Sequence, residues 1–386
     1  MKKETLIENV RTVTPGEDLR KSAILVRNGK IAAVYRAGEP RPSVADTYDA
    51  RGAIAVPGFI DVHMHGACGC DTCDGDDPRA IETIAKAKLE EGCTSFLPTT
   101  LTVSHEDIMK AARNVARYRK TQKYAKALGV HLEGPFINPA WCGAQNPAHV
   151  RKPDIREVLA VAKVVPVKMV SFAPEQEGGA KFAAECVKRG IVPSCGHTGA
   201  TLAQLMPAYE AGLRHFTHFC NQMTKLHHRE IGMVGAGFLI DDLNTEIICD
   251  RIHLCPDMLR LVFAKRPLEH IQIITDSLRC SHLPDGYAFE MGGLKVMLKD
   301  GEARLVEGGN LAGSTLWINK GLKNIAETTG LPLKDIVRTS SWNQAIELGL
   351  GRTLGRIAKG YTADIAILDR KTFDVKAVFV DGERRI

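Results

Sequence analysis

The sequence predicts an α/β fold, a (β/α)8 barrel joined to a small β-sandwich domain that both chain ends build. Two observations predict the barrel: eight short apolar runs recur along the chain, and segments with helical periodicity separate several of them. A third observation, short runs of alternating polarity at both ends, predicts the small domain. With 386 residues, 44% of them hydrophobic and 25% charged, the chain can bury a large core.

The eight apolar runs are bounded by Gly and Pro and suit strands that are buried on both faces of a parallel sheet. Most of them end in a polar or ionisable residue. In order they are FIDVHMH (59–65), TSFLPTT (94–100), LGVHLEG (128–134), KMVSFAPE (168–175), IVPSCGH (191–197), RHFTHFC (214–220), EIICDRIH (246–253) and IQIITDS (271–277).

Five intervening segments place apolar residues three or four positions apart, which predicts amphipathic helices. They are AIETIAKAKLEEG, EDIMKAARNVARY, DIREVLAVAKV, AKFAAECVKRG and TLAQLMPAYEAG. Glycine closes three of them, at Gly92, Gly190 and Gly212, as expected of a helix C-cap.

The two ends of the chain have a different pattern. TLIENVRTV and AILVRNGKIAAVY near the N-terminus, and TADIAILD and VKAVFVDGERRI near the C-terminus, read as short strands. Asn28-Gly29 and Asp381-Gly382 are typical of hairpin turns. We therefore expect residues 1–57 and 356–386 to form one small β-domain, and residues 58–355 to form the barrel.

Composition excludes several classes of partner. The net charge of +6 is small for this length, and no basic block marks a nucleic-acid surface. No signal peptide or transmembrane run is evident, so we expect no membrane partner. Eleven cysteines, an odd number spread over a large chain, argue against a disulfide framework and favour a cytoplasmic protein.

Ionisable residues gather at the predicted strand ends, which in a barrel form the face that carries the active site. His63 and His65 are two positions apart on one strand, so their side chains share a face. The other candidates are Glu133, His197, His218 and Asp276.

Core histidines that are satisfied by neighbours are the alternative for any one of these residues. Five strands ending in such groups favour a divalent metal site instead, because a buried ionisable group without a partner is costly. Imidazole with carboxylate suits Zn, Fe, Mn or Co better than calcium.

The cysteines of ACGCDTCDG, namely Cys68, Cys70 and Cys73, offer a second hypothesis, a structural zinc site. Such sites usually need two separated cysteine pairs, and the chain has no second cluster. We expect these small residues to form only the loop after the first barrel strand.

The motifs FIDVHMHG, HLEGPF, GHTGAT, THFCNQM, HHREIG, ITDSLR and LAGST occur in an order and spacing that resemble the N-acetylglucosamine-6-phosphate deacetylase family of the amidohydrolase superfamily. The resemblance extends over essentially the whole chain. It implies hydrolysis of an acetamido group on an amino-sugar phosphate, with a divalent metal as cofactor.

By position, the resemblance implies that Glu133, His197 and His218 hold the principal metal ion and that Asp276 is the catalytic carboxylate. Some members of the family lack the H-x-H pair and bind one ion. Because this chain keeps His63 and His65, two ions bridged by Glu133 are an open alternative, which gives one or two ions per chain.

The resemblance also implies a set of substrate-binding residues. Phosphate would be held by Asn221, the backbone at Gln222, and Arg229, which in some members reaches the site from a neighbouring subunit and so implies a homodimer. His253 would contact the sugar. The remaining positions are Ala144 and Gln145, and the covering loop Leu311, Ala312 and Gly313.

Three departures from the family pattern bear on specificity. Gln145 stands where some members have a carbonyl-polarising histidine, Arg251 replaces a glycine, and Gln222 replaces a common alanine. An arginine at 251 could add a phosphate contact or clash with the sugar. Arg251 and Gln222 keep N-acetylgalactosamine 6-phosphate open as an alternative substrate.

Two further alternatives stand beside this reading. Cyclic-amide hydrolysis commonly uses a carboxylated lysine, but KMVSFAPE has no lysine at its C-terminal end. A non-enzymatic metal-binding protein is the alternative from another functional class.

Overall fold

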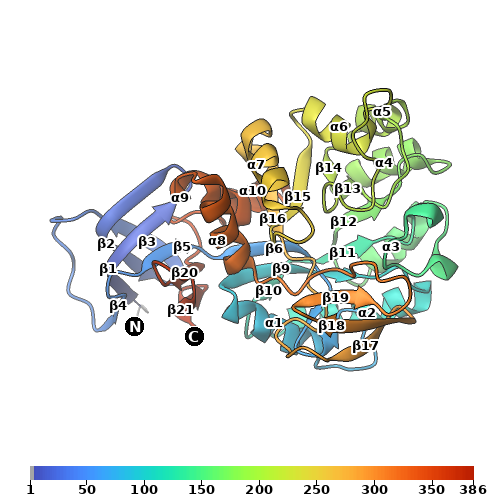
Figure 1. The fold of residues 1–386 in the computed structure, drawn as a ribbon. Coiled ribbons are helices and arrows are strands. Elements are labelled where there is room, and N and C mark those ends of the chain that lie inside the picture. Colours follow the sequence, from blue (N-terminus) through green and yellow to red (C-terminus); the bar gives the residue numbers. More distant parts are fainter. Residues whose placement is uncertain (1–3) are drawn as a thin grey trace.

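The computed structural model describes residues 4–386 and contains a parallel β-barrel wrapped in helices, with a separate sheet at one side (Figure 1). Eight strands form the barrel: β6 (Phe59–Met64), β9 (Cys93–Thr100), β11 (Val130–Glu133), β12 (Val167–Phe172), β13 (Val192–Cys195), β14 (His215–Phe216), β15 (Asn244–Ile248) and β16 (Ile271–Ile274). They pair in this order and all run parallel. Each overlaps one of the eight predicted runs, so the predicted barrel is confirmed.

Backbone hydrogen bonds just beyond the strand ends join the first strand to the last. The Asp276 amide donates to the His63 carbonyl over 2.8 Å, and the His65 amide donates to the Ser277 carbonyl over 2.8 Å. These two bonds bring the first-strand histidines next to Asp276.

Helices cover the outside of the barrel: α1 (Ala80–Glu90), α2 (His105–Arg119), α3 (Ile155–Ala162), α4 (Gly179–Val187), α5 (Leu202–Glu210), α6 (Gly232–Leu239), α7 (Pro256–Lys265) and α8 (Ile318–Thr329). The five predicted helices are the first five of these. Gly92, Gly190 and Gly212 follow three of them with positive φ, as a C-cap requires. At the other end of α5, Thr201 and Gln204 form a capping box.

The N-terminal end of the barrel is closed by α10 (Trp342–Glu347), which follows α9 (Leu333–Ile336). Ala345 of α10 packs into an apolar cluster inside the barrel together with residues such as Ile60, Val62 and Ile274. This plug leaves the opposite, C-terminal end as the open face. Short 3₁₀ turns occur at Pro139–Trp141, Pro147–His149, Leu268–His270 and Val337–Ser340, and the short strand β10 (Lys126–Ala127) pairs with β9.

Both chain ends share one eight-stranded sheet, as the sequence predicted (Figure 1). Its strands are β1 (Glu4–Thr14), β2 (Glu17–Arg27), β3 (Lys30–Tyr35), β4 (Asp46–Asp49), β5 (Ile54–Pro57), β20 (Ile365–Leu368), β21 (Val375–Val380) and β22 (Glu383–Arg384). The long β1 pairs with β4 through its first half and with β5 near its end. Asn28-Gly29 and Asp381-Gly382 form the predicted turns, with positive φ at all four residues. We propose that this unit meets the barrel near Pro57 and again near Arg356.

A three-stranded antiparallel sheet that the sequence analysis did not predict follows the last barrel strand. It consists of β17 (Ala288–Met291), β18 (Leu294–Lys299) and β19 (Glu302–Leu305). The loop 309–313 lies against β19, since the Ala312 amide donates to the Ala303 carbonyl over 2.9 Å. Gly292-Gly293 and Asp300-Gly301 between the strands are the hairpin signals that could have revealed it.

Candidate metal centre and active site

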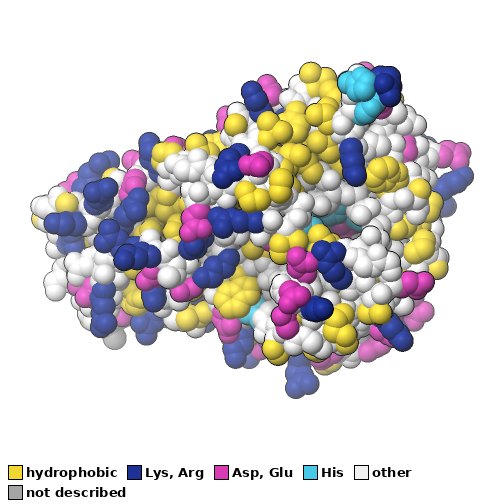
Figure 2. Space-filling view, in the orientation of Figure 1, with side chains coloured by type: hydrophobic (Ala, Val, Ile, Leu, Met, Phe, Trp, Pro, Cys, Tyr) yellow, Lys and Arg dark blue, Asp and Glu magenta, His cyan; other side chains and the backbone are white. Residues whose placement is uncertain are grey.

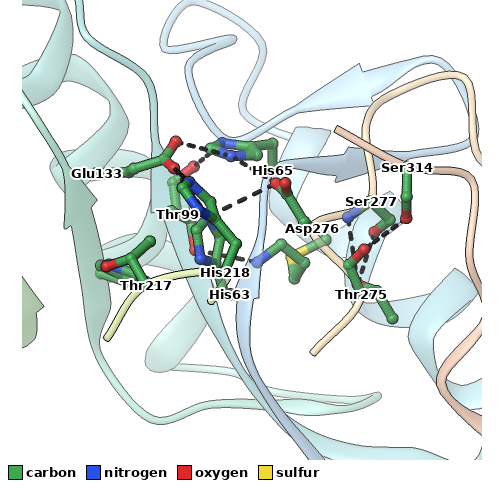
Figure 3. Close-up of polar contacts among 12 residues, drawn as sticks. His63, His65, Thr99, Glu133, Thr217, His218, Thr275, Asp276, Ser277 and Ser314 are labelled. Atoms are coloured by element: carbon green, nitrogen blue, oxygen red, sulfur yellow. Dashed lines mark hydrogen bonds and ion pairs between the residues drawn. The ribbon is translucent and has the colours of Figure 1, made fainter. Parts of the chain in front are cut away.

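Six ionisable side chains meet at the C-terminal end of the barrel, where the sequence placed them. They come from the ends of five strands: His63 within β6 and His65 just after it, Glu133 at the end of β11, His197 after β13, His218 after β14 and Asp276 after β16. Figure 3 shows Glu133 on one side of the group, Asp276 on the other, and His63, His65 and His218 between them. All six are buried.

Glu133 is the centre of the group, and its two carboxylate oxygens together contact four imidazoles. Oε1 lies 3.2 Å from His197 Nε2 and 3.0 Å from His218 Nε2. Oε2 lies 3.2 Å from His65 Nε2, while His63 Nε2 is 3.4 Å from Oε1. Glu133 is therefore placed to bridge two neighbouring positions.

The outer ring nitrogens of three histidines donate to fixed acceptors. His63 Nδ1 is 2.8 Å from a Glu246 carboxylate oxygen, His65 Nδ1 is 3.2 Å from the Thr99 carbonyl, and His197 Nδ1 is 2.8 Å from the Trp141 carbonyl. An Nδ1–H donor leaves the Nε2 lone pair free, and this is the usual second shell of a metal-bound histidine. All three rings are thus held with Nε2 aimed at the centre.

Electrostatics also favour positive charge in the centre. Burial alone would raise the pKa of Glu133, but the imidazoles around it hold the pKa of this carboxyl well below its ordinary value. Burial alone would lower the pKa of His65, but Asp276 and Glu133 raise this pKa to about 10. A cation placed between these carboxylates is therefore favoured.

The residues fit a divalent metal ion on this evidence. His197 Nε2 and His218 Nε2 face each other at 3.0 Å, and the buried His63 Nε2 has no hydrogen-bond partner. Two groups that share Glu133 have ligand atoms close enough to hold one ion each, namely His63, His65 and Glu133, and Glu133, His197 and His218. Nitrogen and carboxylate ligands with Glu133 common to both suit zinc-like ions.

Asp276 is held in an unusual backbone conformation beside the ligands. Its φ is +51°, in the left-handed region, and Ser314 N–H donates to its carbonyl over 2.7 Å. Its Oδ1 lies 3.2 Å from His65 Nε2 and 3.6 Å from His63 Nε2. His197 and His218 also have positive φ, so three of the six residues are held in the left-handed region.

A cavity of about 340 Å³ opens above this group, and five of the six residues, all but His63, line it. Figure 2 shows it as a hollow in the barrel face with histidine side chains at its floor. Of the predicted substrate-binding residues, the following line it: Ala144, Gln145, Asn221, Gln222, His253, Leu311 and Gly313. Ala312 is fully buried between its two lining neighbours.

Two of the lining side chains are fixed by polar contacts. The Gln145 amide donates to Glu133 and accepts from the Thr102 amide over 2.7 Å, so it braces the bridging carboxylate. His253 Nδ1 lies 2.6 Å from Asp250 Oδ2, which leaves Nε2 as its other polar atom. Burial alone would lower the pKa of His253, but the hydrogen bond to Asp250 raises it.

Arg229 is the one predicted site residue that lies apart from this cavity in the described chain. It is exposed, and its Nη1 contacts His228 Nε2 at 2.7 Å. Arg304 of β19 lines the cavity instead, but its guanidinium is paired with Glu302 at 2.6 Å. Sequence reasoning missed Arg304 because it missed β19.

The expectation that Arg251 could reach the substrate is not supported by its position. Its guanidinium is tied to α8 through Glu327 Oε2 at 2.9 Å and the Asn324 carbonyl at 3.1 Å, away from the cavity lining. A φ of +68° explains why glycine suits this position. Gln222 does line the cavity.

The three clustered cysteines do not form a metal group within residues 4–386. Cys68 is exposed, and Cys73 Sγ accepts from the Leu101 amide over 3.3 Å. Gly66–Ala67 (β7) and Cys70–Asp71 (β8) pair as a small hairpin in the loop after β6. The three cysteines therefore belong to the loop after the first barrel strand, as expected.

Comparisons with known proteins agree with this geometry. The sequence profile of the Amidohydrolase family matches residues 54–385. An N-acetylglucosamine-6-phosphate deacetylase of Bacillus subtilis (strain 168) is 33% identical over 374 residues, covering 95% of this chain and 94% of the relative. An N-acetylgalactosamine-6-phosphate deacetylase of Escherichia coli O157:H7 is 33% identical over 362 residues, with 93% of each chain covered.

Among solved structures, the N-acetylglucosamine-6-phosphate deacetylase of Thermotoga maritima superimposes with a TM-score of 0.88 at 37% identity, covering 98% of this chain and 99% of that one. The shared fold, the matching family profile and the similarity over nearly the full length lead to one conclusion. The chain belongs to the amidohydrolase family and, within it, to the N-acetylglucosamine-6-phosphate deacetylases.

Proposed function

We propose that this protein hydrolyses the N-acetyl group of N-acetyl-D-glucosamine 6-phosphate to give D-glucosamine 6-phosphate and acetate. The observation that carries the proposal is the pair of ligand groups sharing Glu133, with Asp276 Oδ1 3.2 Å from His65 at the floor of a cavity. The printed names of the Bacillus subtilis and Thermotoga maritima relatives support this substrate.

The chemistry needs an activated water and a proton carrier, since an amide is a poor electrophile. A divalent metal held by these residues would lower the pKa of a water towards ~7 and polarise the acetyl carbonyl. Asp276 takes the proton from the attacking water as general base and then delivers it to the departing amine. His253 and the loop 311–313 hold the sugar above Asp276.

We further propose that the chain takes up to two divalent ions, of the kind that includes Zn, Fe, Mn and Co. The second imidazole pair, His63 and His65, supports the second ion. Replacing His63 by Gln and His65 by Asn together should remove one ion and leave the protein folded. Elemental analysis of metal-saturated protein measures this, and a wild-type chain that never exceeds one ion would contradict the binuclear site.

Phosphate recognition calls for a cation, and the one Lys or Arg that lines the cavity within residues 4–386, Arg304, is already paired with Glu302. We propose a homodimer in which Arg229 reaches the cavity of the neighbouring subunit and joins Asn221 and Gln222. The exposed Leu226, 57% accessible in the same loop, supports a covered surface there. Sedimentation analysis of the oligomeric state tests this arrangement.

The alternative substrate is N-acetylgalactosamine 6-phosphate, supported by the Escherichia coli relative at equal identity and by Gln222 at the cavity wall. Acetate release from both sugar phosphates and both unphosphorylated sugars decides between them. The glucosamine epimer should give the higher kcat/KM. A preference for the galactosamine epimer would overturn the proposal in favour of the alternative, and no release from any of the four would reject deacetylation.

We also propose a cytoplasmic location. All eleven cysteines are free thiols, which supports a reducing compartment. No helix within residues 4–386 is long and apolar enough to cross a bilayer.

A further inference from the structure

A chain of three buried side chains and the half-buried Glu347 runs from the metal centre through the barrel interior to its closed end. His63 Nδ1 lies 2.8 Å from Glu246 Oε2, and Glu246 Oε1 lies 3.1 Å from His215 Nε2. His215 Nδ1 then lies 2.8 Å from Glu347 Oε1, at the C-terminal end of α10. Carboxylate and imidazole thus alternate from one end of the barrel to the other.

The chain is held at both ends by further donors. Glu347 accepts from Asn244 Nδ2 over 2.7 Å and from Gln272 Nε2 over 2.6 Å. Glu246 Oε2 also accepts from the His218 backbone amide over 3.0 Å. Glu246 therefore contacts the ring of one predicted ligand, His63, and the backbone amide of a second, His218.

Such a chain is expensive to bury. His63, His215 and Glu246 have no measurable exposure, and apolar side chains of similar volume would often stabilise a core as well or better. The barrel interior already contains such an apolar cluster around Ile60 and Val62. Stability alone therefore does not explain why carboxylates occupy this part of the interior.

A separate metal site at His63, His131 and Glu246 is geometrically conceivable, because their ligand atoms lie close together. The hydrogen bonds argue against it. His131 uses both ring nitrogens, Nδ1 to the Val62 carbonyl at 3.0 Å and Nε2 to Ser171 Oγ at 2.7 Å. Glu246 is left with His63 as its partner in the direction of the metal centre.

We propose that Glu246, backed by His215 and Glu347, is the positioning residue of His63. It holds the His63 ring with Nδ1–H outward and Nε2 towards Glu133, and its negative charge strengthens that nitrogen as a ligand. It thereby sets the affinity of the metal position shared by His63, His65 and Glu133. The inference rests on the metal-binding part of the proposed function and not on its substrate.

The test is the affinity of each of two Zn²⁺ ions for the metal-free protein, measured by competition with a chromophoric chelator. Glu246→Gln keeps the shape and an acceptor oxygen but removes the charge. We expect the second ion to bind ~10–100-fold more weakly, as when an outer-shell partner of a ligand is lost. The ion held by Glu133, His197 and His218 should keep its affinity.

Glu91→Gln is the matched control. Glu91 is equally buried and also pairs with an imidazole, His282 Nε2 at 3.0 Å, yet touches none of the predicted ligands. It should leave both affinities unchanged. Equal weakening of both ions by Glu246→Gln, an effect matched by Glu91→Gln, or no effect would each overturn the inference.

Glu347→Gln is the second variant and serves even where Glu246→Gln fails to fold. Glu347 is three contacts from His63, through His215 and Glu246, so we expect a smaller loss at the same ion, ~2–5-fold by attenuation of the outer-shell effect. Unchanged affinity for that ion would contradict the proposed chain. Acetate release is measured separately. A protein that releases no acetate, but whose variants lose one ion selectively, would reject the proposed substrate and leave this inference intact.

Discussion

Two buried clusters of charge lie on opposite sides of the first barrel strand, and they are built differently. Outside the barrel, Lys88 of α1 lies 2.8 Å from Asp61 and 2.6 Å from Glu91. Glu91 also accepts from the Ile318 amide, and Asp61 accepts from Thr275 Oγ1 over 2.6 Å. Inside the barrel, imidazole nitrogens converge on Glu133 and on one another.

The outer cluster is complete within the chain, because its carboxylates meet a lysine and hydrogen-bond donors. The inner cluster lacks such a cation and holds His63 Nε2 without a hydrogen-bond partner. A buried charge cluster made for stability closes on itself, whereas one made for binding leaves ligand atoms open. This difference separates a structural network from a metal site more clearly than residue type does.

Asp276 is the residue of the inner cluster whose replacement should lower the rate of deacetylation most. Asp276→Asn keeps its shape but cannot carry a proton, so we expect kcat to fall by ~10²–10⁴, the usual size of a general acid–base contribution. Metal content should stay near wild type. Steady-state kinetics and elemental analysis on the same preparation measure both quantities.

The pH profile of the same variant sharpens the result. A general base must be ionised, so wild-type kcat falls as pH drops through the pKa of Asp276, and this acidic limb should vanish in the Asn variant. Loss of the metal together with activity would instead make Asp276 a ligand, and the proton carrier would lie elsewhere.

Breaking the outer cluster should affect stability and leave the metal site alone. Lys88→Met leaves Asp61 and Glu91 buried without their shared cation, so we expect a loss of ~3–5 kcal/mol in the free energy of unfolding. Metal content per folded chain should not change. Chemical denaturation measures the loss.

Lys86→Met on the same helix is the control, because Lys86 is exposed. It should change the free energy of unfolding by no more than ~0.5 kcal/mol. If Lys88→Met removed metal while preserving stability, the two clusters would be coupled and the comparison between them would fail.

Sequence patterns predicted the inner cluster better than the outer one. His63, Glu133, His197, His218 and Asp276 could be placed together because strand ends of a parallel barrel meet at one face. Asp61 and Lys88 carried no such signal. The pairing of β6 with β9 shifts register between Asp61 and Met64, so the side-chain alternation that applies to His63 and His65 does not extend to Asp61.

Contacts between residues far apart in the sequence explain the other features that sequence patterns did not predict. Glu246 and His215 sit in ordinary strand positions, and only the barrel's closure brings Glu347 beneath them. The strands β17–β19 alternate in burial and depend on their turns, so continuous apolar runs did not reveal them. Arg251 seemed close to the substrate in sequence, whereas its left-handed backbone turns the guanidinium to α8.

Replacing Arg229 tests whether the inner site, besides lacking a metal cation, also needs a phosphate-binding cation from a neighbouring subunit. We expect Arg229→Ala to raise KM for the phosphorylated sugar by ~10–100-fold, the scale of a lost charge-assisted hydrogen bond. Activity on the unphosphorylated sugar should hardly change. Equal losses on both substrates would give Arg229 a structural role, and a monomeric enzyme with unchanged KM would place the phosphate cation within one chain.

The smallest expected effect is the pH dependence that the outer cluster gives to stability. Burial alone would raise the pKa of Glu91, but Lys88 and His282 hold it below its ordinary value of 4.5. An ionised Glu91 therefore stabilises the fold above that ordinary value, and this contribution is lost as pH falls through the lower pKa of the folded state. Burial alone would lower the pKa of Lys88, but Asp61 and Glu91 raise it, so Lys88 stays charged across this range.

The difference in unfolding free energy between wild type and Glu91→Gln should thus be largest near about pH 7 and shrink towards about pH 3. Measurement in chelator keeps the inner cluster free of metal, so that ligand protonation contributes equally to both proteins and cancels in the difference. The inner carboxylates cannot produce this signal, since both chains retain them. A difference that stays constant over this range would mean that Glu91 acts through packing and its hydrogen bond to Ile318, and that charge does not hold the outer cluster together.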